Sequence, residues 1–159
     1  MIRLIVAVDR KQGMAKKGFQ PWFIPADEKF FTEQTKLYGG NVLVGRTTFK
    51  TFKGPLADRN NYVLTSQTEP IAGVEIINDL MQFLESFLDK DLWVVGGAQV
   101  FDQVMEAGLA DELYITHIEA DFGCDQFFPN YEAFKLAEKG DPQEKNGFIF
   151  YFAKYLKAN

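Results

Sequence analysis

Cysteine and histidine are almost absent from this sequence, which has one of each, Cys124 and His117, in 159 residues. A single cysteine cannot form an internal disulfide, and one cysteine with one histidine cannot supply the ligands of a standard zinc or iron site. No Asp-x-Asp loop with a following glutamate indicates calcium. We therefore expect no metal. We interpret Cys124 as a structural thiol and His117 as a strand residue with a satisfied ring, in preference to catalytic roles.

Basic residues and long hydrophobic runs are also scarce. Seventeen lysines and arginines stand against 22 acidic residues, which gives a net charge of −5. Because no run of basic residues forms a patch, this charge argues against binding to nucleic acids. The apolar stretch before Asp9 is too short for a signal sequence or a membrane span. We expect a cytoplasmic protein with no membrane partner, and a monomer, since no long exposed apolar stripe is left unassigned.

Hydrophobic side chains, by contrast, are abundant. They make up 47% of the residues and aromatic ones 15%, with 16 phenylalanines. This composition is typical of a compact globular protein, and the length suits one domain, residues 1–159, better than two. Two loops, 9–20 and 121–131, are long for such a domain. We interpret them as lids or binding loops, or with equal weight as ordinary surface excursions.

Apolar runs of strand length alternate with helical patterns through most of the chain. The runs lie at 3–8, 41–45, 61–65 and 92–95, and the helical patterns at 25–38, 46–52, 79–88 and 98–107. This alternation predicts an α/β fold with a parallel sheet whose strands are buried on both faces. In the last third, segments 112–120, 134–139 and 148–157 follow one another without a helix. The last two predict a hairpin across 140–147, and therefore an antiparallel edge.

The segment PWFIPADEKFF places an acid beside aromatic residues. If a helix begins at Pro25, then Phe30, Phe31 and Tyr38 share the side of the helix on which Asp27 lies. That side is mostly apolar, so Asp27 is directed toward an apolar surface. A buried carboxylate is unfavourable unless hydrogen-bond partners or a ligand compensate for the lost water, which makes Asp27 a candidate functional residue.

Glycines, hydroxyls and one arginine follow three of the predicted parallel strands. Gly96 and Gly97 separate strand 92–95 from a helix whose first N–H groups could bind an anion. The other two clusters are Arg46, Thr47 and Thr48 after the second strand, and Thr65, Ser66 and Gln67 after the third. Each cluster alone is as typical of a cap or a structural turn, and the glycines do not form the GxGxxG fingerprint. Together, at the carboxyl ends of neighbouring strands, they predict a groove for a phosphate-rich molecule.

Seven segments carry a resemblance to a known family: PWFIPAD with Phe31, GRTTF, PLADRNN, LTSQ, VVGGAQVF, LYITHI and DQFFP. In order and approximate spacing they resemble dihydrofolate reductases, from the first strand to the last. The resemblance implies a central, mostly parallel eight-stranded sheet with an antiparallel C-terminal edge strand and about four flanking helices. It also implies an enzyme that reduces 7,8-dihydrofolate to 5,6,7,8-tetrahydrofolate with NADPH and binds antifolate inhibitors. The implied reaction transfers hydride from nicotinamide C4 to pterin C6, with protonation at N5.

The resemblance assigns roles to residues on the substrate side. Asp27 would hold the pterin ring, assisted by the Thr116 hydroxyl, and Trp22 would complete the catalytic group. Phe31 would lie against the aminobenzoyl ring, and Arg59 would bind the α-carboxylate of the glutamate tail. The remaining substrate-binding residues would be Ile5, Val6, Ala7, Leu56, Val95 and Phe101.

On the cofactor side, the pyrophosphate of NADPH would lie over the glycine turn, and the Gly96–Gly97 peptide bond would be cis. Arg46, Thr47 and Ser66 would surround the 2′-phosphate, which favours NADPH over NADH. The other expected cofactor-binding residues are Ala7, Gln20, Thr48, Thr65, Gln67, Ala98, Gln99, Val100 and Phe101. Gln12, Ala15 and Gln20 are unusual in the family's active-site loop, and they predict a less stable closed state of that loop.

Two alternatives stay open. A pyrimidine reductase of riboflavin synthesis would share the fold and NADPH, but Asp27 and Arg59 do not suit its substrate, which carries a phosphorylated ribityl chain in place of a glutamate tail. A non-catalytic protein that binds pterins or nucleotides could use the same scaffold.

Overall fold

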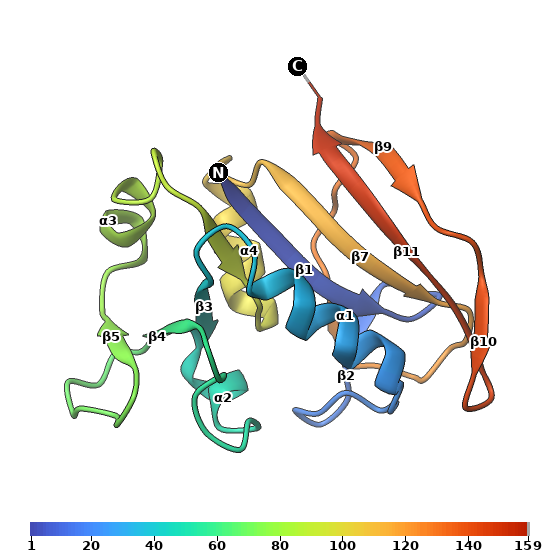
Figure 1. Cartoon of the computed structure of the whole chain (residues 1–159), viewed down its shortest axis with the longest axis horizontal. Coiled ribbons are helices and arrows are strands. Elements are labelled where there is room, and N and C mark those ends of the chain that lie inside the picture. Colours follow the sequence, from blue (N-terminus) through green and yellow to red (C-terminus); the bar gives the residue numbers. More distant parts are fainter. Residues whose placement is uncertain (159) are drawn as a thin grey trace.

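The computed structural model describes residues 1–158, and a large sheet forms its centre (Figure 1). The strands, in their order across the sheet, are β10 (Gln143–Lys145), β11 (Phe148–Lys157), β7 (Glu112–Ile118), β1 (Ile2–Val8), β6 (Leu92–Val94), β3 (Asn41–Gly45), β4 (Asn60–Leu64) and β5 (Glu75–Ile77). Another strand, β9 (Phe134–Lys139), shares one edge of β11 with β10. The strands from β7 to β5 are parallel, and β11 runs antiparallel to β7. The predicted mostly parallel sheet with an antiparallel edge is confirmed.

Successive residues of the central strands face opposite layers. Leu4 of β1 points to the face that α3 (Leu80–Glu85) and α4 (Ala98–Glu106) cover. Its neighbour Ile5 points to the other face and packs with phenylalanines of α1 (Pro25–Thr35). Both faces of the parallel strands are therefore buried, which explains why their sequences are apolar without interruption.

The helices begin where the sequence predicts, but they end earlier. Pro25 opens α1, and the Asp79 carboxylate caps α3 by accepting a hydrogen bond from the backbone N–H of Gln82 at 3.1 Å. The expected extension of the first helix to Tyr38 is wrong, because α1 ends at Thr35 and Tyr38 has a φ of 57°. The helices expected at 46–52 and 79–88 are likewise shorter, at Arg46–Phe49 (α2) and Leu80–Glu85. No helix within residues 1–158 is long and apolar enough to cross a membrane.

Several short strands have no counterpart in the sequence prediction. The expected hairpin partners β9 and β11 do pair, but β10 lies inside their predicted connection. The two long loops contain β2 (Gly13–Ala15) and β8 (Gln126–Phe127), which pair with each other in a separate two-stranded sheet. The segments 9–20 and 121–131 are therefore joined, and each depends on the other for its conformation.

A buried ion-pair network ties β1 to β7. The Arg3 guanidinium donates from Nε to Glu112 Oε2 at 2.9 Å and from Nη1 to Asp91 Oδ1 at 2.7 Å. The side chains of Arg3 and Glu112 are 8% and 10% exposed. Glu112 also accepts a hydrogen bond from the Tyr114 hydroxyl. Each buried charge in this network therefore has a partner, as a stable fold requires.

Glu112→Ala should lower the free energy of unfolding by about 3 kcal/mol, because it leaves the buried Arg3 guanidinium with Asp91 alone. Urea unfolding measures this change. The matched control is Glu33→Ala, which breaks the exposed pair of Glu33 with Lys29 and should cost less than about 0.5 kcal/mol. Equal losses in the two variants would contradict a structural role for the buried network.

Candidate active site

Asp27 lies in the first turn of α1, and its side chain reaches the central sheet. Its Oδ1 accepts a hydrogen bond of 2.6 Å from the hydroxyl of Thr116, a buried residue of β7. Burial raises the pKa of Asp27 to about 6 from an ordinary value of 3.8, and the Thr116 hydrogen bond opposes only part of this rise. The surroundings of Asp27 therefore disfavour the ionised form of its carboxylate.

The apolar residues predicted around Asp27 divide between two faces of the sheet. Four of them belong to one group on the α1 face: Ile5, Phe31, Leu56 and Val95. Ala7 and Trp22 pack together in a neighbouring group. The side chains of Val6 and Phe101 lie in the core on the α4 face instead, and Phe101 is fully buried. Their contacts with a substrate stay predictions. Such contacts would have to come from backbone atoms or follow a small rearrangement.

Arg59 is fixed by a residue that the sequence did not single out. Its Nη1 donates to Thr35 Oγ1 at 2.9 Å, and its Nε donates to the carbonyl of Ala57 at 2.9 Å. Thr35 is completely buried in the last turn of α1, and its hydroxyl donates to the carbonyl of Phe31 at 2.8 Å. Within the described residues Nη2 of Arg59 has no hydrogen-bond partner, so this nitrogen remains for a ligand. No local pattern identifies Thr35, because its partner lies 24 positions away.

The glycine turn between β6 and α4 is closely packed against the end of β3. The Gly96–Gly97 peptide bond is cis, as predicted. The N–H of Gly45 donates to the carbonyl of Gly96 at 2.8 Å, and a Cβ on Gly97 would lie only 2.6 Å from Thr48 Oγ1. Since a side chain at Gly97 would displace Thr48, the close packing of the turn against α2 requires glycine at this position.

Arg46 shows most directly that this region suits an anion. Its Nη1 is buried and has no hydrogen-bond partner among residues 1–158. A buried guanidinium N–H without an acceptor is costly, and an anionic ligand would remove that cost. Thr47, the residue after Arg46, is exposed, and so is Ser66, which follows the neighbouring strand β4. Thr65 is buried, and its hydroxyl accepts a hydrogen bond from the N–H of Gln67. The residues present therefore suit a phosphate-bearing cofactor.

Other predicted cofactor-binding residues differ in their exposure. Ala98, Gln99 and Val100 form the first turn of α4, where only Val100 is buried. Gln20 is exposed at the end of the 9–20 loop. Their contacts with NADPH stay predictions.

His117 and Cys124 have the surroundings of structural residues. His117 Nε2 shares a hydrogen bond of 2.8 Å with the Tyr155 hydroxyl, and burial lowers the pKa of His117 to about 4. Burial likewise raises the pKa of Cys124 to about 11, so the thiol stays protonated near neutrality. No group of three or more His, Cys, Asp or Glu side chains in the described part of the chain could hold a metal ion.

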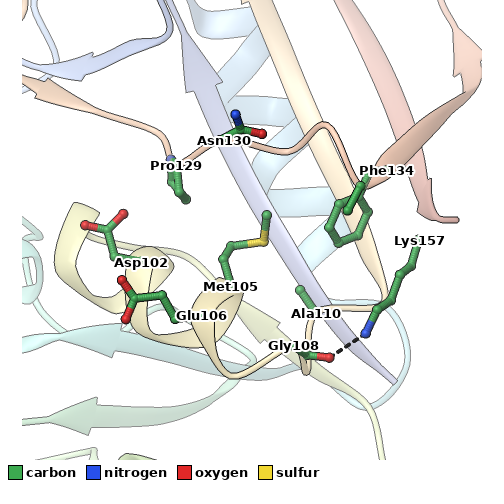
Figure 2. A pocket seen from close by; sticks show the side chains of 10 residues that line it. Asp102, Met105, Glu106, Gly108, Ala110, Pro129, Asn130, Phe134 and Lys157 are labelled. Carbon is green, nitrogen blue, oxygen red and sulfur yellow. Dashed lines mark hydrogen bonds between the residues drawn. The ribbon is translucent and has the colours of Figure 1, made fainter.

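Two surface cavities lie apart from this site. Figure 2 shows the first, with a volume of about 370 Å³, between the carboxyl half of α4 and the segment that follows β8. Asp102 and Glu106 of α4 contribute carboxylates to it, which do not suit a phosphate or a carboxylate ligand. None of the predicted site residues lines it. The second, of about 360 Å³, is lined by Gln12, Phe134 and residues 128–132.

The comparison with known proteins assigns the family. A family model described as dihydrofolate reductase matches residues 1–157. The chain belongs to the dihydrofolate reductase family. It is 32% identical to the dihydrofolate reductase of Bacillus subtilis (strain 168), over 100% of this chain and 96% of that protein. It is 34% identical to the dihydrofolate reductase of Staphylococcus aureus, over 91% of each chain.

A solved structure of the dihydrofolate reductase family has the same fold. The dihydrofolate reductase from Enterococcus faecalis, complexed with NADP(H) and RAB-propyl, superposes with a TM-score of 0.85 at 31% identity. The match covers 100% of this chain and 97% of that one. The dihydrofolate reductase fold expected from the sequence motifs is therefore confirmed.

At pH 7.5, Asp27→Asn should raise the free energy of unfolding of the ligand-free protein by up to about 3 kcal/mol. The pKa of Asp27 rises from 3.8 to about 6 on folding, so the folded state loses stability as the pH increases through this interval. The difference between the two proteins should shrink toward pH 4, where the wild-type carboxyl is largely protonated. Urea unfolding at both pH values measures it, and a variant that is less stable than wild type at pH 7.5 would contradict the argument.

Proposed function

We propose that this chain catalyses the NADPH-dependent reduction of 7,8-dihydrofolate to 5,6,7,8-tetrahydrofolate, in one domain that spans residues 1–159. The observation that carries the proposal is the Asp27 carboxylate, buried beside apolar side chains with the Thr116 hydroxyl as donor. Such a carboxylate gains most from a ligand that donates two parallel N–H groups. The 2-amino group and the adjacent ring nitrogen of a pterin offer that pair.

Asp27 orients the ring, and a water completes the proton transfer. The Thr116 hydrogen bond fixes Oδ1 of Asp27, and with it the plane in which the pterin lies. Trp22 Nε1 is buried without a hydrogen-bond partner in the described chain, so it can donate to a water in the cleft. We infer that a water delivers the proton to pterin N5, while NADPH, when bound, supplies the hydride to C6.

The polar groups at the ends of β3 and β6 would hold NADPH. The buried, unpartnered Arg46 Nη1 supports an ion pair with the 2′-phosphate, next to the exposed hydroxyls of Thr47 and Ser66. The Gly96–Gly97 turn and the first N–H groups of α4 would receive the pyrophosphate. Positive charge is thus available where the phosphorylated cofactor has its additional negative charge.

Arg59 would bind the glutamate tail of the substrate. Thr35 and the Ala57 carbonyl occupy Nη1 and Nε, so the guanidinium is oriented before the substrate arrives, and Nη2 would be available to the incoming carboxylate. Preorganisation of this kind saves part of the entropy that binding would otherwise cost. Antifolate inhibitors that present the same N–H pair to Asp27 would compete for this cleft.

We infer that the protein works in the cytoplasm as a monomer. A net charge of −5 and a single cysteine support this location. The large apolar side chains that are exposed, such as Phe19, Leu88 and Leu136, come from separate segments of the chain, which supports a monomeric state.

Purified protein mixed with NADPH and dihydrofolate tests the function. Loss of nicotinamide absorbance only when dihydrofolate is present supports the reductase. Binding of both ligands without oxidation would favour a non-catalytic binding protein. Oxidation that requires a phosphorylated ribityl pyrimidine, and not dihydrofolate, would favour the pyrimidine reductase.

Asp27→Asn should lower turnover of dihydrofolate at pH 7 by roughly 100-fold or more, because the charge that polarises the pterin is lost. Binding of NADPH, measured by quenching of tryptophan fluorescence, should be unchanged. Steady-state rates near those of wild type at pH 7 would remove Asp27 from the mechanism.

Arg46→Met should raise KM for NADPH roughly 10- to 100-fold and leave KM for NADH nearly unchanged, because only NADPH carries the phosphate that pairs with the guanidinium. The ratio of kcat/KM for the two cofactors measures the effect. Equal losses with both cofactors would mean that Arg46 supports the local structure and does not read the 2′-phosphate.

A further inference from the structure

An exposed ion pair lies beside the arginine proposed to bind the substrate tail. Lys36 Nζ is 3.6 Å from Asp58 Oδ2, and the two side chains are 41% and 81% exposed. Asp58 immediately precedes Arg59, and Lys36 immediately follows Thr35, whose hydroxyl accepts a hydrogen bond from Arg59 Nη1. Two adjacent contacts therefore join the end of α1 to the segment around Arg59. The first orients the guanidinium, and the function described above assigns no role to the second.

The loop that carries Asp58 is fixed by the side chain of Asn61, a buried residue of β4. Its Oδ1 accepts from the N–H of Leu56 at 2.9 Å, and its Nδ2 donates to the carbonyls of Leu56 and Arg59 at 2.9 and 3.1 Å. Asp58, between these two residues, has a φ of 60°, a left-handed conformation that aspartate and asparagine tolerate better than most residues. Because the backbone is held on both sides, Asp58 keeps its place next to Arg59.

Asp58 brings a negative charge close to the point where an anionic ligand would bind. Burial lowers the pKa of the Arg59 guanidinium, and the nearby charge of Asp58 opposes part of this change. The charge that favours the guanidinium must also repel a carboxylate that approaches Arg59 Nη2. Lys36, which is paired with Asp58, carries the opposite sign and offsets this repulsion.

Exposure determines how large the effect of these charges can be. An ion pair between exposed side chains contributes little to stability, because water and salt screen it. Removing either Asp58 or Lys36 should therefore leave the fold intact, while it changes the electrostatic potential at Arg59. Screening sets the expected effect on ligand affinity at roughly two- to fivefold for each charge.

We propose that Asp58 and Lys36 are specificity-determining residues, which set how strongly the Arg59 subsite binds an anionic substrate tail. Asp58 lowers the affinity for a carboxylate, and Lys36 raises it. This inference rests on the proposed function, because it concerns the same glutamate tail. A pterin without a carboxylate makes no use of Arg59, so its affinity depends on neither charge.

Asp58→Asn and Lys36→Met test the proposal, because they break the same ion pair and change the local charge in opposite directions. Asp58→Asn should lower KM for dihydrofolate roughly two- to fivefold, and Lys36→Met should raise it by a similar factor, with smaller changes in kcat. Both shifts should shrink at high salt. KM for 6-methyl-7,8-dihydropterin, which has no carboxylate, should be unchanged in both variants.

The other exposed ion pair of α1, between Lys29 and Glu33, supplies matched controls. Glu33→Gln and Lys29→Met change the net charge by the same amounts, but these residues lie on the side of the helix away from Thr35. KM for dihydrofolate should be unchanged in both controls. Shifts as large as those of Asp58→Asn and Lys36→Met would show an effect of net charge alone, and would overturn the proposal.

The sign of the two shifts separates a role in binding from a structural one. If the ion pair only stabilised the loop, Asp58→Asn and Lys36→Met would change KM for dihydrofolate in the same direction, which would overturn the proposal. Equal shifts for 6-methyl-7,8-dihydropterin would also overturn it.

Equilibrium binding of dihydrofolate, measured by quenching of tryptophan fluorescence, distinguishes failure of this proposal from failure of the proposed function. A wild-type protein that binds dihydrofolate without oxidising NADPH would overturn the proposed function. The shifts of Kd in the two variants would still decide the roles of Asp58 and Lys36. A wild-type protein that does not bind dihydrofolate would overturn both.

Discussion

The free-energy cost of the Asp27 carboxylate is the constraint on which the rest of the site depends. The fold places this acid beside apolar side chains with the Thr116 hydroxyl as a donor, and its pKa rises to about 6 as a result. A poorly solvated carboxylate binds a ligand with matching N–H donors more strongly than a hydrated carboxylate would. Burial of Asp27 therefore lowers the stability of the free protein, and it makes binding of the heterocycle stronger and more directional.

Buried polar groups in this protein divide into two kinds. Arg3 and Glu112 are paired with each other and with further partners, and their role is to join strands. Arg46 Nη1 and Trp22 Nε1 are buried but unpartnered within residues 1–158. A fold retains such groups at a cost, and the places where it does so coincide with the proposed phosphate and water positions. Buried polar groups without hydrogen-bond partners thus distinguish the proposed site from the structural core.

The sequence predicted the parts of the structure that local pattern controls. Continuous apolar runs located β1, β3, β4 and β6 to within about two residues, because strands buried on both faces have no polar alternation. The ends of the helices and the short strands β2, β5, β8 and β10 were missed. β2 and β8 pair with each other from distant parts of the chain, whereas β10 pairs with the neighbouring β11 but consists of three polar residues that show no strand pattern. Distance along the chain likewise hides the Thr35–Arg59 bond, which no local spacing encodes. The partnership of Asp27 with Thr116 was expected only from the family resemblance.

Strand register determines whether Asp27 has its partner at all. On β7, Thr116 faces the α1 side together with Tyr114, while Leu113 and Ile115 face the α4 side. Its register neighbours are Ala7 on β1 and Phe152 on β11, so a shift of one residue would replace the hydroxyl with Ile115 or His117.

The C-terminal strand also holds the helix that carries the acid. Phe152 stacks on Phe30 of α1, with centroids 4.0 Å apart and planes inclined by 12°, and Phe30 lies three residues after Asp27. The antiparallel strand at the end of the chain thus fixes both the hydroxyl on β7 and the helix that presents the carboxylate. β11, a strand that contributes none of the predicted site residues, is therefore a structural requirement of the site.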